Sequence, residues 1–87
     1  MNKQALTEII ISKMEEACLA NDSQLIEDIN DETQLMETGL DSLGFAVVVV
    51  MLEEELGFDP FAESDEIIYP ENFSEFLHIY YDHLNEK

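Results

Sequence analysis

Residues 39–43, Gly-Leu-Asp-Ser-Leu, place one serine at the predicted start of an apolar helix. The first turn of a helix has backbone N–H groups without partners, and the helix dipole favours an anion there. A hydroxyl at this position is suited to carry a phosphate ester. We therefore expect Ser42 to be a site of modification and not a catalytic residue. An ordinary N-cap formed by Asp41 and Ser42 is the alternative explanation of the same residues.

The residues that follow Ser42 support the first explanation. A helical pattern of apolar residues continues from Leu43 to Leu56, and a Leu-Glu-Glu-Glu-Leu-Gly segment occupies residues 52–57. In a short acidic chain, this arrangement resembles the phosphopantetheine-dependent carrier proteins, which carry acyl, peptidyl or aminoacyl groups. The resemblance covers about residues 5 to 84. It implies that Ser42 bears 4'-phosphopantetheine through a phosphodiester, and that the terminal thiol of this arm holds the cargo as a thioester.

The resemblance also implies a set of partner enzymes. A phosphopantetheinyl transferase would attach the arm, a loading ligase or acyltransferase would supply the cargo, and a condensing or tailoring enzyme would receive it. The chain would then be a free-standing carrier and not an enzyme. Val47 departs from the family pattern, in which an acidic residue is common, so we expect a specialised polyketide, fatty-acid-like or nonribosomal peptide pathway. The alternative is a small acidic helical adaptor or inhibitor without a prosthetic group.

A surface for these partners is predicted on the helix that begins near Ser42. On a helical wheel one face is predicted to join the core, and it holds Phe45, Val48, Val49, Leu52 and Leu56. Carboxylates near a helix C-terminus are unfavourable by about 0.3 to 1 kcal/mol each, so stability alone does not explain residues 53–55. The predicted partner-contact residues are Leu40, Asp41, Leu43, Ala46, Val47, Val50, Glu53 and Glu54. A helix buried on both sides is the alternative.

Composition limits the classes of function. The chain has 87 residues, enough for one small domain over residues 1–87, and its 46% hydrophobic content argues against disorder. It has 21 acidic residues against three lysines and no arginine, which gives a net charge of -18. Nucleic acid is excluded as a partner because phosphate binding requires clustered Lys and Arg. Enzymes with basic surfaces are expected instead.

The sequence also bears on location. The first residues lack the layout of a signal peptide, and the longest apolar run, residues 45–52, is far below the roughly 20 residues that span a bilayer. We therefore expect a cytoplasmic monomer that does not enter membranes. Cys18 is the only cysteine and is expected to be a buried free thiol, as is usual in a reducing compartment.

Hydrophobic periodicity predicts an all-α fold. A first helix over residues 3–20 has a core stripe of Leu6, Ile10, Met14, Ala17 and Cys18. A long ordered loop over residues 21–41 is anchored by Leu25, Ile26, Ile29 and Leu35. The second helix covers residues 43–56, a short helix lies within residues 61–67, and a last helix ends near residue 84. The expected fold is a small four-helix bundle of the acyl-carrier-protein type, with three main helices and a short third one.

Two of these assignments depend on specific signals. The run Val47 to Val50 is β-branched and would suit a strand, but the pattern is too long for a strand and ends at Gly57, a residue typical of helix C-termini. The last helix begins with Asn72 and has Glu75 three residues later, which predicts a capping box.

Other motifs do not predict a site. Residues 39–44 resemble a hydrolase nucleophile elbow, but the spacing of its glycines is wrong. His78 and His83 are five residues apart and fall on different faces of a helix, so no metal site is expected. Asp28, Asn30 and Glu32 alternate like the start of a calcium loop, but Thr33 stands where such a loop needs glycine.

Overall fold

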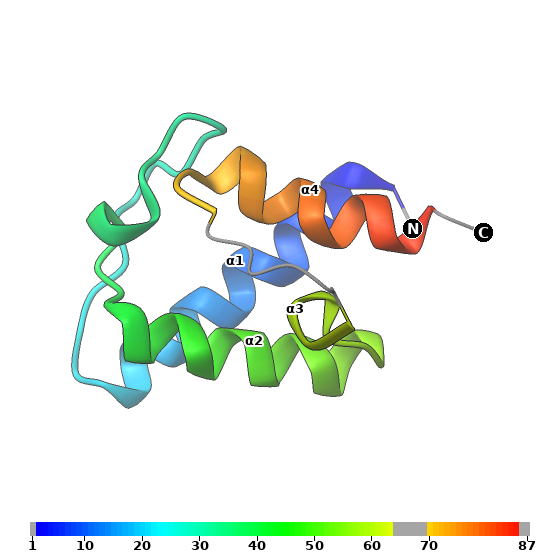
Figure 1. Cartoon of the computed structure of the whole chain (residues 1–87). Helices are drawn as coiled ribbons and strands as arrows, with labels where there is room; N and C mark the ends of the chain where they lie inside the picture. Colours follow the sequence, from blue (N-terminus) through cyan, green and yellow to red (C-terminus); the bar gives the residue numbers. More distant parts are fainter. Residues whose placement is uncertain (1, 64–69, 86–87) are drawn as a thin grey trace.

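The computed structural model describes residues 2–63 and 70–85 and confirms the predicted small four-helix bundle (Figure 1). The helices are α1 (Lys3–Ala20), α2 (Ser42–Leu56), α3 (Pro60–Glu63) and α4 (Phe73–Leu84), and a short 3-10 helix, η1, covers Leu35–Glu37. The described residues form no strand apart from one isolated bridge between Gln34 and Asn72. No helix among them is both long enough and apolar enough to cross a membrane.

The helices enclose one apolar core. α1 contacts both α2 and α4, and α3 packs on α4 near the end of α2 (Figure 1). The predicted stripe of α1 is confirmed, because all five of its residues are buried. The remaining buried apolar residues are Leu35, Leu40, Phe45, Val48, Leu52, Phe73, Phe76, Leu77 and Tyr80. The core therefore draws on the long loop as well as on the three main helices.

Polar side chains fix where the main helices begin. Asn2 accepts a hydrogen bond from the backbone N–H of Ala5 at 2.7 Å and so caps α1. The predicted capping box of α4 is confirmed: Asn72 accepts from the Glu75 N–H at 2.9 Å, and the Glu75 carboxylate accepts from the Asn72 N–H at 3.4 Å. Each cap satisfies an N–H group that the helix itself leaves unpaired. α2 ends, as predicted, at Gly57.

The long loop between α1 and α2 is ordered by backbone hydrogen bonds to the start of α4. The N–H of Phe73 donates to the carbonyl of Thr33 at 2.9 Å, and the N–H of Leu35 donates to the carbonyl of Glu71 at 3.0 Å. The Thr33 carbonyl thus pairs with an N–H group in the first turn of α4. Of the predicted anchors, Leu35 is buried, but Ile26 is 39% exposed and is not an anchor.

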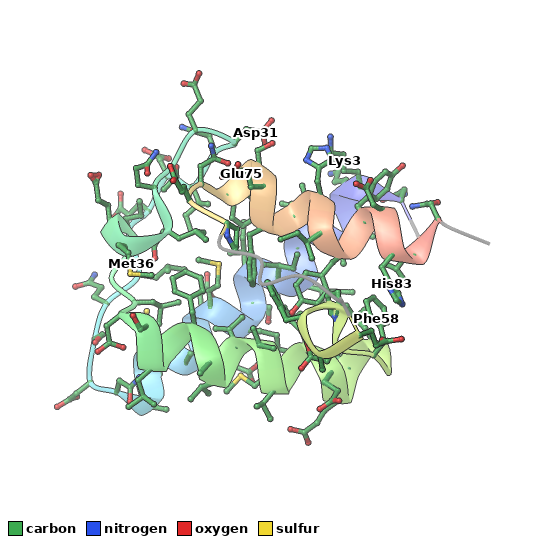
Figure 2. The ribbon with its side chains drawn as sticks, viewed as in Figure 1. Lys3, Asp31, Met36, Phe58, Glu75 and His83 are labelled. Atoms are coloured by element: carbon green, nitrogen blue, oxygen red, sulfur yellow. The ribbon has the colours of Figure 1, made fainter. Side chains whose placement is uncertain are left out.

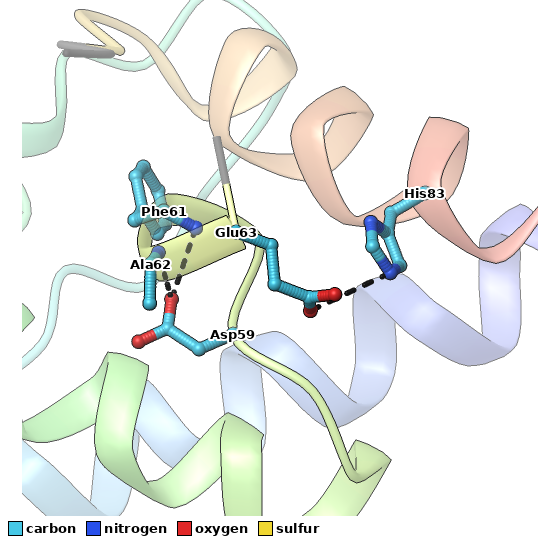
Figure 3. A network of polar contacts seen from close by, with 5 residues as sticks. All are labelled: Asp59, Phe61, Ala62, Glu63 and His83. Atoms are coloured by element: carbon cyan, nitrogen blue, oxygen red, sulfur yellow. Dashed lines mark hydrogen bonds and ion pairs between the residues drawn. The ribbon is translucent and has the colours of Figure 1, made fainter. Parts of the chain in front are cut away.

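The short helix α3 begins one residue earlier than predicted. The Asp59 carboxylate accepts hydrogen bonds from the N–H groups of Phe61 and Ala62 at 2.9 and 3.2 Å, which makes it the cap (Figure 3). The structure describes α3 as Pro60–Glu63, and the predicted continuation to residue 67 lies outside the described residues. Four residues cannot form a stable helix alone, so side-chain contacts with α4 must hold α3 in place.

Candidate functional site

Ser42 is the first residue of α2, and it is exposed. Asp41 precedes it and accepts a hydrogen bond from the Gly44 N–H at 2.8 Å, so Asp41 is the N-cap. The Ser42 hydroxyl and the N–H groups of Ser42 and Leu43 have no hydrogen-bond partner among the residues that the structure describes. A free hydroxyl therefore lies beside two free backbone donors at the positive end of the helix dipole.

The turn before Ser42 is held against the long loop. Gly39 has φ +107°, and a side chain there would collide with the backbone carbonyl of Gln24. The N–H of Ile26 donates to the carbonyl of Thr38 at 3.0 Å, and the fully buried Thr38 hydroxyl donates to the carbonyl of Leu35 at 2.7 Å. These contacts fix the path by which the chain enters α2.

Leu40 is not on the surface, which corrects its assignment as a partner contact. Its side chain is 3% exposed. It lies under the first turn of α2 against Gly44, where an added Cβ would stand 2.8 Å from the Leu40 Cδ2. The helical wheel used in the prediction covers only the residues of the helix. Leu40 lies in the turn before the helix, so the wheel could not predict that its side chain is buried. Leu40 helps to position Ser42 from below.

The exposed face of α2 combines apolar and acidic side chains. Leu43 is 68% exposed and Val50 is 55% exposed, and Ala46 between them is exposed as well. The acidic members of the predicted contact set, Asp41, Glu53 and Glu54, are also exposed. We call these six residues the α2 face: Asp41, Leu43, Ala46, Val50, Glu53 and Glu54.

Val47 is half-buried and packs against the core, so its placement on the exposed face was wrong. Successive residues of a helix are about 100° apart, so Val47 and Val49 lie on either side of the fully buried Val48. α2 packs on α1 and also contacts α4 through Phe45 and Phe76, and both flanking valines are partly covered. Val49 and Leu56, which were predicted in the core, are likewise only partly buried.

An open pocket of about 540 Å³ lies beside Ser42. Its wall is mostly apolar. Side chains of η1, α2, α3 and α4 form it, together with Pro70, which precedes α4. The lining residues are Leu35, Met36, Ser42, Phe45, Ala46, Val49, Phe61, Pro70 and Phe76. Met36 is 60% exposed and lies above the start of α2 (Figure 2). Sequence reasoning missed this pocket because its wall joins segments far apart in the chain.

A small network holds α3, which supplies Phe61 to the pocket wall. The Glu63 carboxylate lies 3.7 Å from the His83 Nε2 of α4 (Figure 3). The His83 ring stacks on Phe58, with ring centroids 4.3 Å apart and planes 16° from parallel. Together with the Asp59 cap, these contacts tie both ends of α3 to its surroundings. His83 thus has a packing role on the last helix.

The two described lysines join helices. The Lys13 Nζ of α1 lies 3.3 Å from Glu16 and 3.4 Å from Glu55 of α2. The hydrogen bond to Glu16, reinforced by the charges of Glu16 and Glu55, raises the pKa of Lys13. The Lys3 Nζ of α1 lies 6.0 Å from the centroid of the Tyr81 ring of α4. The α2 face itself contains no cation.

Three other groups that the sequence analysis considered lie within the fold or form local contacts. Cys18 is a buried free thiol, as predicted, and burial raises its pKa. His78 Nδ1 lies 2.7 Å from the carbonyl of Ser74. In the segment that resembles a calcium loop, the Thr33 hydroxyl accepts from the Asn30 N–H at 2.9 Å and closes a turn. Within residues 2–63 and 70–85, no cluster of three or more His, Cys, Asp and Glu is arranged to bind a metal ion.

The fold and the site are therefore those of a small helical protein that presents one serine at a helix tip, between an apolar pocket and an acidic face. The family model for the phosphopantetheine attachment site matches residues 7–63. The chain belongs to this family, whose domains bind 4'-phosphopantetheine covalently. Comparisons with curated proteins and with solved structures gave no significant match. The resemblance recognised in the sequence is thus confirmed, and carrier proteins of this kind work with a phosphopantetheinyl transferase and with biosynthetic enzymes.

Proposed function

We propose that Ser42 carries the 4'-phosphopantetheine arm and that the protein transfers thioester-bound acyl or aminoacyl intermediates between biosynthetic enzymes. The observation that carries this proposal is the exposed Ser42 at the start of α2, with its hydroxyl and the neighbouring amides unpaired among the described residues. A phosphodiester there would be adjacent to the N–H groups of Ser42 and Leu43 and to the positive end of the helix dipole. The Asp41 carboxylate is engaged with Gly44, inside the first turn.

The attachment step needs no catalytic group from this chain. In the active site of a transferase, the Ser42 Oγ attacks the pantetheine-bearing phosphorus of coenzyme A. The new bond joins Oγ to phosphorus, the pyrophosphate P–O bond breaks, and adenosine 3',5'-bisphosphate leaves. A base on the transferase accepts the serine proton. The arm then supplies a terminal thiol on which the cargo forms a thioester.

The pocket beside Ser42 gives the cargo a place on the protein. Its volume of about 540 Å³ lies within the range of about 300 to 1,000 Å³ that is usual for small-molecule sites. Its wall is apolar, with Phe45, Val49 and Phe76 among the lining residues. We propose that an apolar cargo enters this pocket and is protected there from water and from unrelated enzymes.

The α2 face is proposed as the docking surface for partner enzymes. Its exposed Leu43 and Val50 would contact apolar side chains of the partner, and Glu53 and Glu54 would contact lysines or arginines. The partners proposed are a phosphopantetheinyl transferase, a loading ligase or acyltransferase, and a condensing or tailoring enzyme. The half-buried Val47, where carriers of this type commonly have an acid, favours a specialised pathway of the polyketide, fatty-acid-like or nonribosomal peptide kind.

We further propose that the protein is not itself an enzyme and that it works as a monomer in the cytoplasm. All chemical steps on the cargo would then belong to the partners. The buried free thiol of Cys18 is compatible with a reducing compartment. The high negative charge opposes self-association.

A mass measurement tests the attachment. The protein is incubated with coenzyme A and a broad-specificity transferase, and its intact mass is measured. We expect the wild type and Ser23→Ala to gain one phosphopantetheine each, because Ser23 is exposed but lies in the loop. Ser42→Ala should gain none. Addition to Ser42→Ala would show that another residue is the attachment site.

The same measurement addresses the alternative function. A small acidic adaptor or inhibitor would use the α2 face for docking but would have no prosthetic group. No mass addition to a correctly folded wild type, with several transferases, would support the adaptor.

A further inference from the structure

The buried hydroxyl of Tyr80 has no role in the contacts described so far. Tyr80 lies on α4 and is fully buried, and its ring packs against Phe58, Phe61 and Phe76 with centroid distances of 5.9, 6.0 and 5.4 Å. Its hydroxyl has no hydrogen-bond partner among the described residues. A buried polar group without a partner lowers stability, and phenylalanine would fill the same space without this cost. The hydroxyl therefore needs an explanation.

The Tyr80 ring packs against two residues of the pocket wall, Phe61 and Phe76. Ser42, Ala46 and Val49 line the pocket along successive turns of α2. The carboxylates whose charges act on the hydroxyl are those of Asp59 and Glu53, and Glu53 is one turn beyond Val49. Because Phe61 and Phe76 line the pocket and also contact the Tyr80 ring, the ring and the pocket share this part of the wall.

The chemistry of the hydroxyl restricts what it can bind. Burial raises the pKa of Tyr80, and the nearby charges of Asp59 and Glu53 raise it further, so the group stays protonated and can donate a hydrogen bond. The same two carboxylates oppose a second negative charge at this position. A neutral acceptor, such as a ketone, amide or ether oxygen, is the group that would satisfy the hydroxyl.

We infer that Tyr80 is a specificity-determining residue, and that the cargo is an apolar chain whose far end has an uncharged hydrogen-bond acceptor that receives the Tyr80 hydroxyl. The inference rests on the proposed attachment at Ser42. Phe61 lines the pocket and contacts the Tyr80 ring, so a cargo that reaches Tyr80 would displace the Phe61 side chain. Phe61 lies on the four-residue helix α3, whose position depends on only a few contacts (Figure 3).

Matched cargoes test the inference. A transferase loads the protein with coenzyme A derivatives in which an amide replaces the thioester, so that the cargo is not hydrolysed. One chain ends in a methyl ketone, a second of equal length ends in an alkyl group, and a third ends in a carboxylate. Intact mass confirms loading, and the melting temperature of each loaded form is measured.

In the wild type, the ketone-ended chain should raise the melting temperature by about 4 °C or more above the alkyl-ended chain, the shift that one buried hydrogen bond gives a domain of this size. The carboxylate-ended chain should give no such gain. In Tyr80→Phe the difference between ketone and alkyl chains should disappear. In Tyr81→Phe it should persist, because the half-buried Tyr81 packs against His78 and Lys3 and not against Phe61 and Phe76 of the pocket wall.

The unloaded variants separate cargo recognition from a structural role. Unloaded Tyr80→Phe should melt at or above the wild-type temperature, because it loses an unpartnered hydroxyl. A lower melting temperature would show that the hydroxyl stabilises the fold itself and would overturn the inference. Equal melting of the ketone and alkyl forms, in protein that is loaded by mass, would overturn it while the attachment at Ser42 stands. Failure of loading would overturn the proposed function and, with it, this inference.

Discussion

Gly39 lies so close to Gln24 that a Cβ on the glycine would collide with the backbone carbonyl of Gln24. The contact joins the beginning of the long loop to the turn that precedes Ser42. Gly39 also has φ +107°, in the region that residues with side chains rarely adopt. Two independent constraints therefore require glycine at this position.

Gly39→Ala should lower the free energy of unfolding by more than about 2 kcal/mol, because it combines an unfavourable φ with a backbone collision. Gly57→Ala is the matched control. Gly57 has φ +89° but no atom within 4 Å of the added Cβ, so only the backbone cost of about 1 kcal/mol should appear. Denaturant unfolding of both variants measures the difference. Equal losses would mean that the contact with Gln24 adds nothing.

Three substitutions to aspartate on α2 should differ in their effect on stability. Val48 is fully buried, so Val48→Asp should cost more than about 3 kcal/mol and unfold much of the protein. Val50→Asp should change stability by no more than about 0.5 kcal/mol, because Val50 is 55% exposed. The half-buried Val47 should give an intermediate loss. Circular dichroism during denaturant titration ranks the three, and equal damage at positions 48 and 50 would contradict the described orientation of α2.

Lys13→Met should lower the melting temperature at neutral pH more than Lys3→Met does. Both variants lose one positive charge, but only Lys13 bridges Glu16 of α1 and Glu55 of α2. The hydrogen bond to Glu16 and the neighbouring charges raise the pKa of Lys13 in the folded protein. Its contribution is therefore complete below the unfolded pKa of about 10.4 and is lost as the pH rises through the folded pKa.

The check is a series of melting curves between pH 7 and pH 11.5. The difference between wild type and Lys13→Met should be constant up to about pH 10 and should shrink above it. A difference that grows at high pH would contradict the assigned ion pairs.

Cys18 should resist thiol reagents in the native protein. It is 2% exposed, and burial raises its pKa, so both access and the fraction of reactive thiolate are low. Alkylation at pH 8 should be at least about 100-fold slower than in denaturant, since it requires transient opening of the fold. Mass spectrometry over time measures the rate. Rapid alkylation of the native apo protein would show that the end of α1 is open.

Local signals predicted the main helices well. The stripe of α1 and the Asn72–Glu75 capping box involve residues within a few turns of each other, and the structure confirms both. Non-local contacts could not be predicted in this way. The hydrogen bond from Phe73 to Thr33 and the pocket wall formed by Met36 with Phe61 depend on how distant segments meet.

The errors on α2 have a similar origin. A helical wheel divides residues into an inner and an outer face, but α2 contacts both α1 and α4, and Val47 falls on the border between the faces. Leu40 was included among the predicted partner contacts, but it is buried. Its burial depends on the turn at Gly39 and on the space above Gly44, neither of which has a simple sequence signature.

Lys3 and Lys13 lie between helices, and this affects how the protein meets other molecules in solution. Two copies that approach each other repel, because the chain has 21 acidic residues against three lysines, and Lys3 and Lys13 lie against groups of their own molecule. Each copy should therefore diffuse alone. A basic enzyme should capture it quickly, with an association rate that falls steeply as ionic strength rises. The equilibrium affinity for such an enzyme should also fall as salt screens the attraction.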